Sequence, residues 1–165
     1  MNAAAAGWCT FTVADRVCAL DVTRVQEVLR PLPVTPLPLA PPAVRGLLNL
    51  RGRIVPAVDL RAVLGLPPAA PGAAPGGHLI VFDGDSPVSL IVDSIGDVRR
   101  AVGAALVPVP HTLDGPARDL VAGALPRPDG LLLALDLDRT LERAFAGATP
   151  HPATGRPPRP AGGPR

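Results

Sequence analysis

VRGLLNLRGRIVPAVDL, residues 44–60, places short apolar runs on both sides of a polar turn and predicts two strands joined as a hairpin. Gly52 can adopt the positive φ that a two-residue hairpin turn requires, so Arg51 is expected at the exposed tip. Pro56 cannot donate a hydrogen bond to a neighbouring strand, which predicts an edge or a bulge at that point. Asp59 is expected to cap a short helix directly after the hairpin.

Working outward, strand patterns continue on both sides of this hairpin. The segments with strand composition are 8–13, 17–22, 78–83, 88–93 and 131–135. Residues 30–42 contain six prolines, which exclude a long helix and predict an extended segment. Near the C-terminus, Asp136 is expected to cap a helix that runs to about Phe145 with one apolar face. The class predicted is therefore all-β, with short helical turns and a C-terminal helix.

The second half of the chain resembles the first. VRGLLNLRGRIVPAVDL aligns with VAGALPRPDGLLLALDL, residues 121–137, with six of 17 positions identical at an offset of 77. LRPLPVT, residues 29–35, aligns with LVPVPHT, residues 106–112, with four of seven identical. A shared strand–turn–cap pattern is the alternative, but the matched blocks keep their order, so we favour an ancient duplication. Two similar β halves predict two small barrels packed together.

The domain prediction follows from this repeat. We expect one domain over residues 8–145, with lobe one at about 8–66 and lobe two at about 78–145; strand exchange between the lobes is left open. Residues 67–77 are Pro, Gly and Ala in composition and predict a loop. Residues 146–165 offer little to bury, so a disordered tail is expected.

Charge and composition exclude several classes of protein. Residues 1–145 carry 13 Arg and 14 acidic residues, a net charge of −1, and the remaining three Arg lie in the tail. A nucleic-acid partner is not expected, because such proteins carry a basic face. No apolar run reaches the roughly 18 residues of a membrane span, and no secretory signal pattern is present, so a cytoplasmic protein without membrane insertion is expected. Cys9 and Cys18 are therefore expected to be reduced and packed.

Patterns typical of catalysis are missing from the sequence. The three His residues stand alone, no CxxC or HxxxH spacing occurs, and the chain has no Lys. Paired carboxylates such as Asp93 with Asp97 could perform acid–base chemistry, but caps and solvated loop positions explain them better. We therefore expect no enzyme activity, no metal and no cofactor, and interpret the chain as an interaction module.

Several motifs together resemble the CheW family, the coupling proteins of bacterial chemotaxis-type signalling. They are VQEVL at 25–29, VTPLPLAPPAVRG at 34–46, LLNLRGRIVPAVDLRAVLG at 47–65 and SLIVDSIGDV at 89–98. The NLRG-x-IVP-x-VDLR pattern is the most specific, and the resemblance covers residues 8–145 in order. It implies a fold of two five-stranded SH3-like barrels that share a hydrophobic interface.

The resemblance also implies a function without catalysis. CheW-like proteins bridge the cytoplasmic tip of methyl-accepting chemotaxis receptors and the regulatory domain of a CheA-type histidine kinase. The expected role is a scaffold in chemotaxis signal transduction. The alternative is an SH3-like protein-interaction module of another two-component or motility pathway; binding of Pro-rich ligands would need an aromatic groove, and the chain has only four aromatic residues.

Transferred by position, the resemblance implies two sets of binding residues. The receptor-binding set is Val25, Glu27, Val28, Gly46, Arg51 and Val98. The kinase-binding set is Leu32, Val34, Val107 and Val109.

Apolar valines would line a groove for an amphipathic receptor helix, while a carboxylate and a guanidinium at its rim set orientation. We expect Glu27 and Arg51 to lie close enough to form an ion pair. In the second repeat Pro128 stands where Arg51 stands in the first, so the hairpin itself does not require the arginine.

Overall fold

The computed structural model describes residues 6–74, 76–101 and 105–147. Its strands are β1 (Ala6–Val13), β2 (Arg16–Asp21), β3 (Val25–Leu29), β4 (Val44–Leu50), β5 (Arg53–Asp59), β6 (Gly77–Asp83), β7 (Ser86–Val92), β8 (Ser94–Ala101), β9 (Val121–Arg127) and β10 (Gly130–Leu135). Its helices are the 3₁₀ turn η1 (Val22–Arg24) and the α-helices α1 (Leu60–Val63), α2 (Pro116–Leu120) and α3 (Leu137–Ala144).

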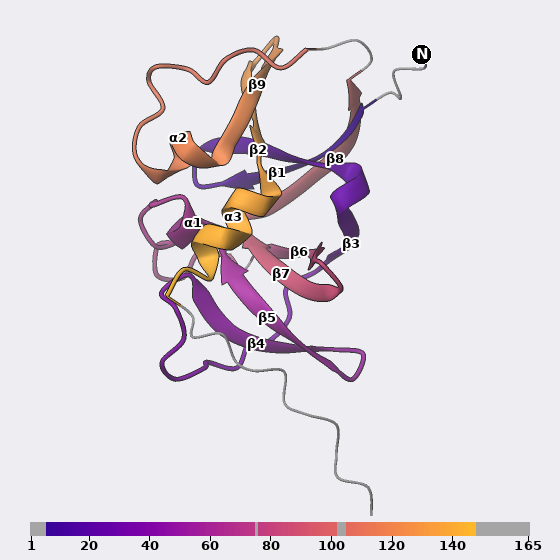
Figure 1. The fold of residues 1–165 in the computed structure, drawn as a ribbon, viewed down its shortest axis with the longest axis vertical. Helices are drawn as coiled ribbons and strands as arrows, with labels where there is room; N and C mark the ends of the chain where they lie inside the picture. Colours follow the sequence, from indigo (N-terminus) through magenta and orange to yellow (C-terminus); the bar gives the residue numbers. More distant parts are fainter. Residues whose placement is uncertain (1–5, 75, 102–104, 148–165) are drawn as a thin grey trace, which may run out of the picture.

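These strands form two five-stranded sheets, as predicted. The first sheet has the order β8-β1-β2-β10-β9, and the second has the order β3-β6-β7-β5-β4. Figure 1 shows the two sheets one above the other along the long axis of the molecule, with α1 and α3 beside their junction. The arrangement is consistent with two SH3-like barrels packed together.

The two sheets do not follow the two halves of the sequence. The first sheet takes β1 and β2 from residues 8–66 and β8, β9 and β10 from residues 78–145, whereas the second sheet is built from β3 to β7. Strands are thus exchanged between the two halves of the chain, and neither barrel coincides with residues 8–66 or 78–145 alone. β2 continues into β3 through the 3₁₀ turn η1, and β7 continues into β8 through Asp93 alone, so neither following strand folds back onto the hairpin that precedes it. β3 consequently pairs with β6, and β8 pairs with β1.

The internal repeat predicted from the sequence is visible in the topology. If β1–β5 are replaced by β6–β10 and the reverse, the strand order of one sheet becomes the strand order of the other. The parallel pairings also correspond, since Ala134 lies opposite Ala19 and Ala57 lies opposite Ser89. Equivalent backbone bonds, Asp59 N–H to the Ala43 carbonyl and Asp136 N–H to the Leu120 carbonyl, both measure 2.8 Å. Each barrel is thus completed by the other half of the duplicated chain.

The β4–β5 hairpin forms as its sequence predicts. Arg51 and Gly52 both have positive φ, at 51° and 83°, and the Gly52 N–H donates to the Asn49 side chain over 2.8 Å. Pro56 lies where β5 has β4 as its only neighbour, because pairing with β7 begins at Ala57. The prediction of an edge at the proline is therefore confirmed.

The helices begin at the predicted caps. The Asp59 carboxylate accepts a hydrogen bond from the Arg61 N–H over 2.9 Å at the start of α1. The Asp136 carboxylate accepts one from the Arg139 N–H over 3.1 Å at the start of α3. The described residues of the predicted 67–77 loop contain no helix or strand before β6 begins at Gly77. Most of the predicted tail, residues 148–165, lies outside the described residues.

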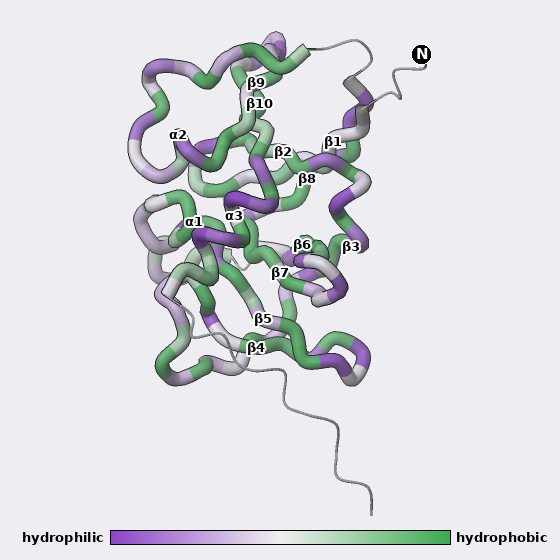
Figure 2. The backbone as a smooth tube through the Cα atoms, viewed as in Figure 1, coloured by the Kyte–Doolittle hydropathy of each residue, from purple (hydrophilic) through white to green (hydrophobic). Residues whose placement is uncertain are grey.

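One hydrophobic core connects the two sheets. It contains buried residues of β1 and β2 together with β5, β6, β7, β10 and all three α-helices. In Figure 2 the strands are mostly hydrophobic, and the β4–β5 turn is hydrophilic. Cys9 and Cys18 are buried in this core and free, as predicted, and burial raises the pKa of the Cys18 thiol to about 12. The largest cluster of buried side chains is therefore shared by the two barrels, and each sheet adds a small cluster of its own.

An ion pair fixes the crossover between β7 and β8. Arg61, on α1, donates from Nε and Nη2 to the two carboxylate oxygens of Asp93 over 2.9 and 2.6 Å. The same carboxylate accepts the Ala14 N–H from the β1–β2 turn over 2.6 Å. Hydrogen bonds from Arg61 lower the pKa of Asp93. The Asp93 carboxylate thus connects α1, which follows β5 of the second sheet, to the β1–β2 hairpin of the first sheet.

The equivalent crossover between β2 and β3 carries a second ion pair with its charges exchanged. Arg24, in η1, lies 2.7 Å from Asp138 on α3. Asp138 corresponds to Arg61 at the offset of 77. The helix α3 therefore contributes the acidic residue of its ion pair, whereas α1 contributes the basic residue of the other. Both side chains of this pair are more exposed than those of Arg61 and Asp93.

Replacing Arg61 by Ala is expected to lower the free energy of unfolding by about 1–3 kcal/mol, because Asp93 loses its charged hydrogen-bond donor. Arg24→Ala is the matched control, and its cost should stay below about 1 kcal/mol because solvent screens that pair. Urea unfolding of both variants measures the difference. Equal losses of unfolding free energy would show that the Arg61–Asp93 pair stabilises the fold no more than the exposed Arg24–Asp138 pair does.

Candidate functional site

Glu27 and Arg51 form the ion pair that the sequence predicts. Arg51 donates from Nη1 and Nη2 to the two carboxylate oxygens of Glu27 over 2.8 and 2.7 Å. The Arg51 side chain is 71% exposed and that of Glu27 is 21% exposed. These hydrogen bonds lower the pKa of Glu27 below its ordinary value. The parallel, two-bond geometry holds the guanidinium plane in one orientation at the surface.

The ion pair joins the two edges of the second sheet. Glu27 lies on β3 and Arg51 at the tip of the β4–β5 hairpin, and β3 and β4 are the outermost strands of that sheet. Thr35 and Leu47 add two backbone hydrogen bonds of 2.8 Å between the segment after β3 and β4. The sheet therefore curls until its edges meet, and Glu27 and Arg51 lie at that seam.

The predicted receptor-binding valines fall in different environments. Val28 on β3 is 44% exposed and Val98 on β8 is 60% exposed. Val25 is half-buried and packs against the core. Val28 and Val98 correspond to each other at the offset of 70, and each lies on the outer strand of its sheet. Two of the three valines are thus available to a partner.

Gly46 does not belong to an open binding surface. It is buried in β4 with φ 153°, and a Cβ at this position would lie 1.9 Å from the Thr35 carbonyl oxygen. The close approach that the glycine permits is therefore made by the chain itself, between β4 and the segment after β3. A role of Gly46 in receptor binding stays a prediction, and the structure gives it an additional role inside the second sheet.

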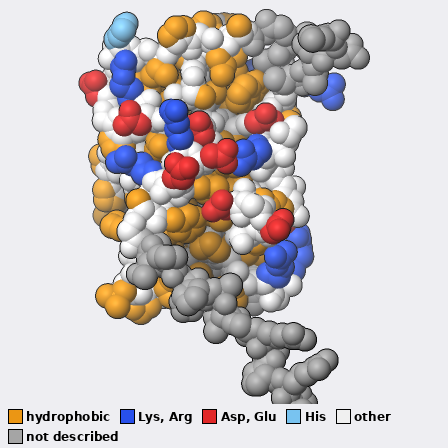
Figure 3. Space-filling model, viewed as in Figure 1, with side chains coloured by type: hydrophobic (Ala, Val, Ile, Leu, Met, Phe, Trp, Pro, Cys, Tyr) orange, Lys and Arg blue, Asp and Glu red, His pale blue; other side chains and the backbone are white. Residues whose placement is uncertain are grey.

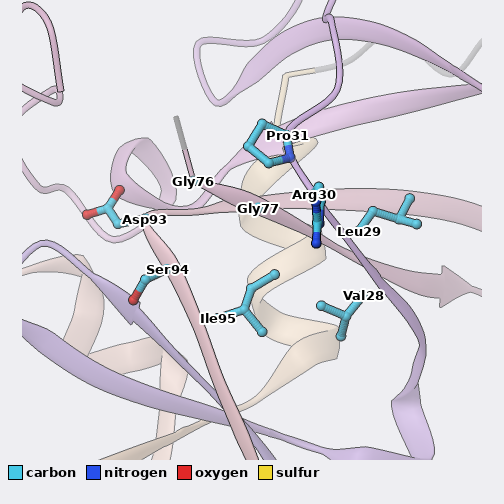
Figure 4. Close-up of a pocket in the computed structure, with 9 residues that line it drawn as sticks. All are labelled: Val28, Leu29, Arg30, Pro31, Gly76, Gly77, Asp93, Ser94 and Ile95. Carbon is cyan, nitrogen blue, oxygen red and sulfur yellow. The ribbon is translucent and has the colours of Figure 1, made fainter. Parts of the chain in front are cut away.

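A depression of about 430 Å³ lies where the two outer strands β3 and β8 approach each other. Its lining is Val28, Leu29, Arg30, Pro31, Gly76, Gly77, Asp93, Ser94 and Ile95. Figure 4 shows Val28 and Ile95 facing each other across it. Ile95 was absent from the predicted set, although it is the repeat counterpart of Val25 at the offset of 70. That correspondence was the available signal for it.

The predicted kinase-binding residues are divided between the two sheets. Leu32 and Val34 are half-buried and pack against Leu48, Val55 and Ala57 of the second sheet. Val107 is exposed at 37%, and its backbone exchanges hydrogen bonds with Ala124 of β9. Val109 is half-buried against the main core. Leu32 and Val34 therefore form one apolar surface, and Val107 belongs to another.

The chemistry available at these surfaces is that of protein contact. On the face drawn in Figure 3, acidic and basic side chains are intermixed, with hydrophobic side chains between them. Within residues 6–74, 76–101 and 105–147, no cluster of three His, Cys, Asp or Glu side chains could hold a metal ion. In that same part of the chain, none of the helices has the length and apolar character needed to span a membrane. The fold and site define a two-barrel β protein with surfaces suited to binding other proteins.

Comparison with known proteins identifies the family. The family model described as the CheW-like domain matches residues 8–145. The chemotaxis protein CheW of Rhizobium meliloti (strain 1021) is 30% identical over 130 residues, which cover 78% of this chain and 82% of that protein. The chemotaxis protein CheW of Treponema pallidum (strain Nichols) is 26% identical over 133 residues, covering 79% and 78%.

The fold comparison agrees with the sequence comparison. The crystal structure of the scaffolding protein TtCheW from Thermoanaerobacter tengcongensis is similar with a TM-score of 0.70 and 27% identity, covering 80% of this chain and 84% of that one. The chain belongs to the CheW family of chemotaxis scaffold proteins.

Replacing Arg51 by Ala is expected to raise the pKa of Glu27 toward its ordinary value of 4.5, because the hydrogen bonds that favour the carboxylate are lost. Carboxyl-carbon NMR titration measures this change. Because the folded-state pKa is the lower one, the pair contributes stability above pH 4.5 and loses it as the pH falls through the folded-state value. An unchanged Glu27 titration would contradict the ion pair in solution.

Proposed function

We propose that this chain is a non-enzymatic, cytoplasmic adaptor that couples methyl-accepting chemotaxis receptors to a CheA-type histidine kinase. The CheW family couples chemoreceptors and CheA in general. The observation that carries the proposal for this chain is the Glu27–Arg51 pair, held in two-bond geometry at the seam of the second barrel. An exposed, oriented ion pair is a specific recognition element that the fold does not require, because the second repeat has Pro128 in place of Arg51.

The proposed receptor surface combines this pair with apolar side chains of the outer strands. Val28 and Ile95 line the depression between β3 and β8, and Val98 lies further along β8. An amphipathic helix could place its apolar side on these residues and its polar side against Glu27 and Arg51. The receptor tip is proposed as that helix.

Co-assembly of the full chain with a receptor cytoplasmic fragment and the kinase tests the function. Kinase activity and co-sedimentation are read with and without this chain. The expected result is a ternary assembly whose kinase responds to the receptor only when the chain is present. Folded protein that binds neither partner would overturn the proposal.

Arg51→Ala is expected to weaken receptor binding by about tenfold or more while the midpoint of thermal unfolding changes little, since the side chain is mostly exposed. Arg127→Ala is the matched control, because Arg127 pairs with Asp129 at the β9–β10 hairpin of the other repeat. Titration calorimetry with the receptor fragment measures both. Equal effects of the two variants would remove Arg51 from the receptor surface.

Val107→Asp is expected to reduce affinity for the kinase regulatory domain by about tenfold, because a charge enters an apolar contact. Val107→Ala should change it far less. Both variants should fold, since the side chain is partly exposed and the backbone hydrogen bonds between Val107 and Ala124 of β9 do not depend on it. Binding to kinase regulatory domain immobilised on a surface measures these affinities. Unchanged affinity of Val107→Asp would show that the kinase contact does not include Val107.

A further inference from the structure

His78 is a buried polar residue that the proposed function does not use. It lies on β6, is 3% exposed, and makes two hydrogen bonds through its ring. Nδ1 lies 2.8 Å from Oγ of Ser89 on β7, and Nε2 lies 3.1 Å from the backbone nitrogen of Leu32. A backbone N–H can only donate, so Nε2 accepts and the ring proton resides on Nδ1, which donates to Ser89. This arrangement requires a neutral imidazole.

The bond to Leu32 is an isolated anchor in its segment. β3 ends at Leu29, and the next backbone pairing begins at Thr35, which exchanges hydrogen bonds with Leu47. Among the described residues, the Leu32–His78 bond is the one hydrogen bond made by the backbone of residues 30–34. It therefore adds a directional contact to the apolar packing that holds Leu32 and Val34 on the second sheet.

Protonation of His78 would remove this anchor. Nε2 would then carry a proton directed at the Leu32 N–H, which is also a donor, and the new charge would be buried. The charged side chains that line the adjoining depression of about 440 Å³ are Arg45, Asp59, Arg61 and Asp93. They pair with one another, Arg45 with Asp59 and Arg61 with Asp93, so their carboxylates are already engaged. Burial lowers the pKa of His78 below its ordinary value.

The other repeat shows that the barrel can be built without this polar pair. At the offset of 70, Trp8 stands in place of His78 and Ala19 in place of Ser89. Trp8 packs with Ala19, Leu125 and Leu132 in an apolar cluster of the first sheet. The histidine and serine are thus specific to the barrel whose neighbouring segment carries Leu32 and Val34.

We propose that His78 is a proton-sensitive latch, which holds residues 30–34 on the second sheet while its ring is neutral and releases them when it is protonated. The latched state has its full stability above the ordinary histidine pKa of about 6.5 and loses it as the pH falls below that value. Acidification would then disorder Leu32 and Val34. Its effect on kinase binding rests on the proposed function, whereas the latch itself does not.

The test follows the wild-type chain between about pH 7.5 and pH 5, the range in which a histidine can titrate. NMR reports the ring of His78, and hydrogen exchange, corrected for the intrinsic pH dependence, reports the amides. We expect the protection of the Leu32 amide to fall by about tenfold or more along the titration of His78, while Leu47 stays protected. Protection of Leu32 that does not follow the His78 titration would overturn the latch.

Two variants make the test specific. His78→Gln keeps a neutral acceptor near Leu32, so its Leu32 protection should no longer depend on pH. His111→Gln is the control, because His111 is exposed and should leave the wild-type pH dependence intact. If His78→Gln does not fold, the wild-type exchange profile alone decides. A pH dependence that persists in folded His78→Gln would also overturn the proposal.

A binding measurement separates this proposal from the proposed function. Affinity for the kinase regulatory domain is expected to fall on acidification for the wild type and to stay constant for His78→Gln, after subtraction of the kinase domain's own pH dependence. Absence of kinase binding at every pH would refute the proposed function and leave the exchange experiment standing. Binding with the same pH dependence in both proteins would refute the link from latch to partner.

Discussion

The structure depends on one constraint, which is that neither half of the chain can complete a barrel alone. The β1–β2 hairpin is buried against β8 and β10 of the other half, and the β6–β7 hairpin is buried against β3 and β5. A single core therefore spans both sheets. The consequence is a rigid relation between the two outer strands β3 and β8, each of which continues directly from a crossover. A groove between barrels can serve as a binding site only if that relation is fixed.

The crossover between β7 and β8 is held by a more buried ion pair than the crossover between β2 and β3. Asp93 accepts hydrogen bonds from the Arg61 guanidinium and from the Ala14 N–H at the point where the chain passes between the sheets. It also lines the depression that contains Val28 and Ile95. The same carboxylate thus contributes to the position of β8 and to the wall of the candidate groove. A substitution of Asp93 is therefore expected to change both the stability of the fold and the shape of the depression.

Local signals predicted much of this fold and less of its assembly. Gly52, Pro56 and Asp59 act through their own backbone geometry, so the hairpin and its helix cap could be predicted from neighbouring residues. Strand exchange could not, because it depends on which distant edge β3 meets, and either barrel would bury similar residues. Gly46 shows the same limit: the sequence indicated a close approach there, but only the structure identifies Thr35 as the approaching group.

Comparison of the two repeats separates what the fold needs from what the surface adds. Caps, core leucines and parallel register are kept in both halves, since each barrel needs them. Arg51 corresponds to Pro128, and His78 corresponds to Trp8, so these polar residues occur in only one barrel. Both lie on the second sheet, one at its seam and one beneath the segment after β3. Because the fold tolerates an apolar residue at either position, their polar chemistry is best explained by interactions that only the second barrel makes.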